Sequence, residues 1–261
     1  NSSPVDVVAT KGGAAMLAPS NLAKAQRSAK GVEKNTGAQT PLTIGLGKYL
    51  TAPLVFDALT GTIAWKRSAT SDSTVATHLD FSNVQFANAD AAGQLSGTWD
   101  SDRLGPGVSN IVGTLSRANT TAIHRYLPAS LSAGTHSWIK GGVQGGVASD
   151  AKFVLKGPLW HFPFRNDEQG VFEVNAQVTG GVLDYADHWP RAEDINTRLL
   201  FRGSSLVGQV AGATISGVPV GATEVKIDDM SSSSPVLEIK GSAAGPMDAF
   251  LRWTLASPVN G

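Results

Sequence analysis

Strand-length segments with apolar side chains at every second position follow one another from Leu54 toward the end of the chain. In the clearest of them, residues 171–178, the apolar positions are Phe172, Val174, Ala176 and Val178. Because successive side chains of a strand point to opposite faces, this alternation predicts strands with one apolar and one polar face. The connections between them are too short for a crossover between parallel strands. The sequence therefore predicts an all-β fold built on antiparallel sheet.

Three parts of the chain need separate interpretation. Segments 5–10 and 14–17, on either side of a Lys-Gly-Gly turn, predict a β-hairpin. Residues 19–48 are polar, basic and low in complexity, which predicts an exposed insertion. Residues 120–143 predict a helical insert of one or two short helices, with candidate N-caps at Thr120, Thr121, Ser132 and Thr135. We expect sheet in the rest of the chain.

Composition narrows the possible functions. The 21 basic residues balance the 21 acidic residues, so no net charge draws the chain to nucleic acid. There is no Cys, which excludes disulfides, thiolate metal sites and a Cys nucleophile. The 29 Gly residues fit many short strands joined by turns. No stretch approaches the roughly 18 apolar residues of a membrane-spanning helix.

Catalytic motifs are absent from the sequence. It contains no Gly-x-Ser-x-Gly, no phosphate-binding Gly-Lys-Ser/Thr and no His-Glu-x-x-His. The five His residues are scattered, so we predict no metal site and no cofactor. Acidic pairs, which also occur in glycosidases and Ca²⁺ sites, stand at Asp100/Asp102, Asp184/Asp187, Glu193/Asp194 and Asp228/Asp229. Each pair falls where a turn is predicted, and turns favour Asp, so we expect a protein that is not an enzyme.

Three motifs carry a family resemblance. They are GPLWHFPF at residues 157–164, GVFEV at residues 170–174 and LDYADHWP at residues 183–190. In this order and spacing they resemble the central region of the YhdP family of AsmA-like proteins. The resemblance runs from about Val5 to Val259, apart from the insertion.

The resemblance implies an architecture and a role. Residues 1–261 are then one β-rich segment of a longer AsmA-like protein, which an additional helix anchors in the inner membrane. The fold is expected to be an elongated, strongly curved antiparallel sheet, open like a taco, whose apolar inner face guides phospholipid acyl chains. The segment is expected in the periplasm, within a bridge between inner and outer membranes that supports outer-membrane lipid homeostasis and the permeability barrier. The implied partners are phospholipid acyl chains and, through the longer protein, inner- and outer-membrane proteins.

The strand pattern supplies candidate groove residues. Stranding one acyl CH₂ in water costs about 0.8 kcal/mol, so such a groove needs a nearly continuous apolar lining. The candidates are Leu79, Phe81, Val84, Phe86, Phe153, Leu155, Phe172, Val174, Leu199 and Phe201. One-sided alternation also fits a closed β-sandwich in which these residues pack against a second sheet. A structural or assembly module without lipid conduction, and a carbohydrate-binding β domain, remain as alternative functions.

Overall fold

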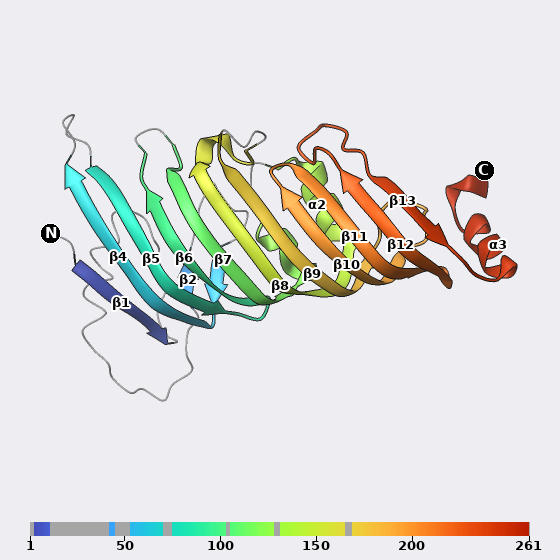
Figure 1. Cartoon of the computed structure of the whole chain (residues 1–261), viewed down its shortest axis with the longest axis horizontal. Helices are drawn as coiled ribbons and strands as arrows, with labels where there is room; N and C mark the ends of the chain where they lie inside the picture. Colours follow the sequence, from blue (N-terminus) through green and yellow to red (C-terminus); the bar gives the residue numbers. More distant parts are fainter. Residues whose placement is uncertain are drawn as a thin grey trace.

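An antiparallel sheet of eleven strands dominates the computed structural model (Figure 1). The structure describes residues 3–10, 42–44, 53–69, 75–102, 105–127, 131–164 and 169–260. From one edge to the other, the strands of the sheet are β1 (Ser3–Thr10), β4 (Ala58–Ala69), β5 (Val75–Ala87), β6 (Ala91–Asp100), β7 (Val108–Asn119), β8 (Val143–Pro158), β9 (Val171–Leu183), β10 (Ala192–Arg202), β11 (Ser205–Ile215), β12 (Val218–Ile227) and β13 (Glu238–Ala243). Strands β1 and β13 are the two edges, so the sheet does not close on itself. The all-β, antiparallel prediction is confirmed.

A second sheet exists, but it is small. In the part of the chain that the structure describes, it consists of β2 (Leu42–Ile44) and β3 (Leu54–Phe56), with three residues in each strand. Two such strands cannot cover one face of an eleven-stranded sheet. The closed β-sandwich is therefore not the architecture of the described residues, and the open, curved sheet is.

The expected helical insert is present between β7 and β8. The 3₁₀-helix η2 (Thr120–Arg125) begins after Asn119, whose side chain accepts a hydrogen bond from the Thr121 backbone N–H. The helix α2 (Ala133–Gly142) begins after Ser132, whose hydroxyl accepts from the Thr135 N–H. Ser132 was among the predicted caps, whereas Asn119 was not. The short 3₁₀-helices η3 (Leu159–His161) and η5 (Pro258–Asn260) are further turns.

The expectation of sheet in the rest of the chain is wrong at α3 (Met247–Leu255). Two features stabilise a helix there. Arg252 pairs with Asp248 one turn earlier, at 2.6 Å. Ala249 is buried, and the Trp253 ring lies 5.9 Å from the Trp189 ring. Tertiary packing thus selects a helix in a segment with no capping side chain.

The N-terminal strand pairs with a strand that is distant in the sequence. β1 is antiparallel to β4, in a register that places Val5 opposite Ile63. The expected partner, residues 14–17, lies outside the described residues. Of the predicted insertion 19–48, only β2 lies among them. The hairpin therefore stays a prediction, and the pairing with β4 joins β1 to a strand more than forty residues away in the sequence.

Bulges bend the strands of the large sheet (Figure 1). Asn83, Asp150 and Asp194 adopt left-handed φ angles of 50°, 49° and 52° where the register shifts. A bulge adds a residue to one strand and increases its local bend and twist. The Glu193/Asp194 pair, predicted as a turn, is therefore part of a bulged strand. The helix α2 and the small sheet lie behind the large sheet in Figure 1, on the same face.

Candidate functional site

The strand register aligns apolar residues of successive strands into rows. The central row crosses eight strands, from β5 to β12, through the paired residues Val84, Leu95, Gly113, Phe153, Val174, Phe201, Leu206 and Ile227. The second row crosses β4 to β9 through Ile63, Phe81, Gly97, Ile111, Leu155 and Phe172. Residues two apart on a strand share a face, as Phe153 and Leu155 do, so both rows belong to one face. We call it the apolar face.

All ten predicted groove residues lie on the apolar face. Seven belong to the two rows, and Leu79, Phe86 and Leu199 pair with Trp99, Gly93 and Gly208 on the same side. The bulge at Asn83 explains why Phe81 and Val84 share a face although three positions separate them. Their partners on β6 are Gly97 and Leu95, which are two residues apart. Whether these residues contact lipid stays a prediction.

Exposure shows that, among the described residues, no continuous second layer covers this face. Val84 is 4% exposed, whereas the other nine predicted residues are only half-buried. Six of the twelve buried apolar residues in the described part of the chain are Ala. Large side chains of a closed core would be fully buried instead. The apolar face is therefore an open groove surface of partly exposed Phe, Leu, Ile and Val side chains.

The opposite face is mainly polar. Beside the central row, the register aligns Gln94, Thr114, Lys152, Asn175, Leu200, Val207, Lys226 and Glu238 on the other side of the sheet. Lys226 pairs with Asp228 at 2.6 Å, and this ion pair raises the pKa of Lys226. From β6 to β12, the apolar face therefore lies opposite a mainly polar one, as the alternation predicted.

The first two sequence motifs meet in space, and the third lies at the other end of β9. The turn after β8 folds back, so that the Phe162 ring lies 5.0 Å from the Phe172 ring on β9. Phe164 is 3% exposed and lies against Gly170. In the third motif, Trp189 lies between Tyr185 and Trp253 of α3. Aromatic contacts therefore pack the chain at both ends of β9.

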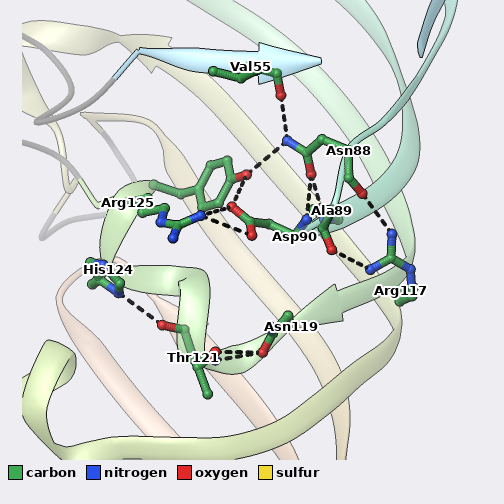
Figure 2. A network of polar contacts seen from close by, with 11 residues as sticks. Val55, Asn88, Ala89, Asp90, Arg117, Asn119, Thr121, His124 and Arg125 are labelled. Carbon is green, nitrogen blue, oxygen red and sulfur yellow. Dashed lines mark hydrogen bonds and ion pairs between the residues drawn. The ribbon is translucent and has the colours of Figure 1, made fainter. Parts of the chain in front are cut away.

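A polar network holds the turn between β5 and β6 (Figure 2). Arg117 donates to the carbonyl oxygens of Asn88 and Ala89 at 2.8 and 3.0 Å. The Asp90 carboxylate accepts from Arg125 at 2.9 Å and from the Tyr126 hydroxyl at 3.0 Å. Burial is the main cause of the raised pKa of Tyr126, so its hydroxyl remains a donor at neutral pH. The network thereby ties η2 to the sheet.

The same network reaches the small sheet. The Asn88 side-chain amide donates to the Val55 carbonyl oxygen of β3 at 2.7 Å and to the Tyr126 hydroxyl at 3.0 Å. Figure 2 shows Asn88 between Val55 on one side and Asp90 on the other. One side chain therefore connects β3, η2 and the β5–β6 turn.

Neither a cluster of metal ligands nor a membrane-spanning helix occurs in the described part of the chain. Within the described ranges, no group of three or more His, Asp or Glu side chains is placed to hold a metal ion. His78 pairs with Asp100 at 2.6 Å on the polar face, where both are well exposed. The helices among these residues are too short or too polar to span a membrane.

Several groove residues escaped the sequence analysis. The rows also include Ile63, Leu95, Ile111 and Leu206. The strands of Leu95 and Ile111 contain Gly97 and Gly113 at apolar positions, which breaks the alternation of large side chains. The signal that remained was the period of two between Leu95 and Trp99 and between Ile111 and Leu115.

The chain is similar to known proteins over most of its length. A family model described as "YhdP protein" matches residues 27–261. A curated relative, "Intermembrane phospholipid transporter YhdP" of Escherichia coli (strain K12), is 28% identical over 127 residues, which are 47% of this chain and 10% of the relative. The matched part thus spans about a tenth of that relative's length. No solved structure matches significantly.

Proposed function

Because this chain belongs to the YhdP family, we propose that it is a groove segment of a protein that transfers phospholipid between membranes. The observation that carries the proposal is the central row, which crosses β5 to β12 without a polar residue. Most of its large side chains are half-exposed, so acyl chains have apolar surface to contact. The name of the relative supplies the ligand class.

The length of the row suits transport better than storage. Neighbouring strands lie about 4.8 Å apart, so eight strands extend roughly 34 Å. A bilayer leaflet holds acyl chains in a layer about 15 Å thick, half the hydrocarbon core. An acyl chain can therefore shift along the row without leaving apolar contact. Exposing only four methylenes would cost about 3 kcal/mol, roughly a hundredfold in population.

In this proposal the chain carries out no chemistry of its own. It works in the periplasm as part of a longer protein anchored in the inner membrane and contacting membrane proteins at each end. The phospholipid headgroups remain in solvent while the acyl chains follow the apolar face. Delivery to the outer membrane then supports its lipid homeostasis and permeability barrier.

A pair of adjacent substitutions tests the proposal. Phe201 belongs to the central row, whereas Leu200 lies on the polar face of the same strand. Phe201→Asp places a carboxylate among acyl chains, and Leu200→Asp places the same group on the opposite face, between Asn175 and Val207. Each variant is purified from a bacterial periplasm, and its bound lipid is quantified by native mass spectrometry and extraction.

We expect phospholipid on the wild type and on Leu200→Asp, and at least tenfold less on Phe201→Asp. Circular dichroism checks that all three are folded. A folded wild-type chain without lipid would instead indicate a structural or assembly module.

A further inference from the structure

Strand β3 places its own apolar side chains on the groove. Burial alternates along it, with Leu54 and Phe56 half-buried and Val55 39% exposed. The Phe56 ring meets Phe86 edge-on, with ring centroids 6.0 Å apart and planes at 73°. Phe86 is one of the groove residues on the apolar face. A segment of the chain therefore covers surface that the proposed function assigns to an acyl chain.

Few interactions hold β3 in this position. Its strand partner is β2, over three residue pairs. Among the described residues, one side-chain hydrogen bond joins β3 to the large sheet. In it, the Asn88 side-chain amide donates to the Val55 carbonyl oxygen. At its end, the Asp57 N–H donates to the Ala87 carbonyl oxygen, which fixes the point where the chain enters β4. A single hydrogen bond and an aromatic pair are weak compared with the pairing within the sheet.

We propose that β2 and β3 form a strap that covers the groove at Phe86 in place of an acyl chain and leaves it, pivoting near Asp57, when lipid arrives. This inference rests on the proposed function. The strap and a lipid compete for the same apolar surface, so each lowers the population of the other. The strap thus keeps an empty groove from exposing Phe86 and is displaced as the groove fills.

The two polar atoms of the Asn88 side chain make different hydrogen bonds. Its Oδ1 accepts from the N–H groups of Asp90 and Ala91, at 3.0 and 2.7 Å, and shapes the turn. Its Nδ2 donates to Val55 and Tyr126. Asn88→Asp keeps the accepting oxygen and removes the donor. This variant therefore releases the strap while leaving the acceptor that holds the turn.

The first test measures binding of cis-parinaric acid, an acyl chain that fluoresces in apolar surroundings. Phe56→Ala and Asn88→Asp remove the two contacts of the strap, so we expect each to bind the probe three- to tenfold more tightly than the wild type. Val112→Ala, on the polar face, is the matched control and should bind like the wild type. Phe201→Asp should bind at least tenfold more weakly.

The second test follows the strap itself. The chain contains no Cys, so Leu54→Cys introduces a single thiol at a half-buried position of the strap itself. We expect saturating cis-parinaric acid to raise the rate of its reaction with a maleimide several-fold. An unchanged or lower rate, with probe affinity unaltered in Phe56→Ala, overturns the strap and leaves the proposed function intact. Failure of the folded wild type to bind the probe overturns both.

Discussion

Gly113 carries no side chain, yet the central row is unbroken where it crosses β7. An added Cβ at this position would lie 2.4 Å from the Phe153 ring and 2.6 Å from the Gln94 carbonyl oxygen. The Phe153 ring therefore occupies the space that a side chain at 113 would take. Glycine at this position lets a large aromatic ring from β8 cover two strands, which keeps the surface both smooth and apolar.

Gly113→Ala should destabilise the fold. Neither the ring nor the carbonyl can move far without disturbing strand pairing, so we expect a loss of about 1–3 kcal/mol in the free energy of unfolding. Gly141 in α2 is the control, because an added Cβ there meets nothing within 4 Å. Gly141→Ala should be neutral or stabilising by up to about 1 kcal/mol. Urea unfolding compares them, and equal effects would contradict the packing role of Gly113.

The secondary-structure elements differ in how well the sequence predicted them. β9 was evident because large apolar side chains alternate with polar ones from Phe172 to Val178 without a glycine. Both helices before β8 were expected, α2 from its actual cap Ser132 and η2 from Thr120 and Thr121, although Asn119 is the residue that caps it. α3 was missed because Pro246 precedes it and no side chain caps it, so its stability comes from Trp189 and other distant contacts. The strap was also unpredictable, since β3 is only three residues long.

The cap of α2 offers a test at this scale. Ser132→Ala removes the acceptor for the Thr135 N–H, a hydrogen bond of 3.0 Å. We expect the free energy of unfolding to fall by about 1 kcal/mol. Ser137→Ala, at an exposed position inside the same helix, should cost nothing, because Ala is the better helix former. Thermal unfolding measures both, and a cost at Ser137 as large as at Ser132 would count against the cap.

For the whole molecule, the alternation of apolar and polar residues predicted which side chains share a face but not how many layers the fold has. Alternation at Phe172 and Val174 places them on one face in either a groove or a sandwich, because both architectures bury one side of a strand. What separates them is the exposure of residues such as Phe153 and Phe201, which depends on what covers the sheet. That covering involves contacts between distant segments. The family resemblance supplied the curved open sheet, and the structure agrees with it.

The central claim is that acyl chains lie on the apolar face and not on the polar one. Phe153 and Val154 are adjacent on β8 and point to opposite faces. A photoreactive benzophenone amino acid placed at either position, in chain expressed in a bacterial periplasm, reacts with whatever C–H groups lie beside it. Irradiation followed by mass spectrometry should find phospholipid adducts at position 153 and not at position 154. Equal labelling of both positions, or labelling of position 154 alone, would contradict the groove.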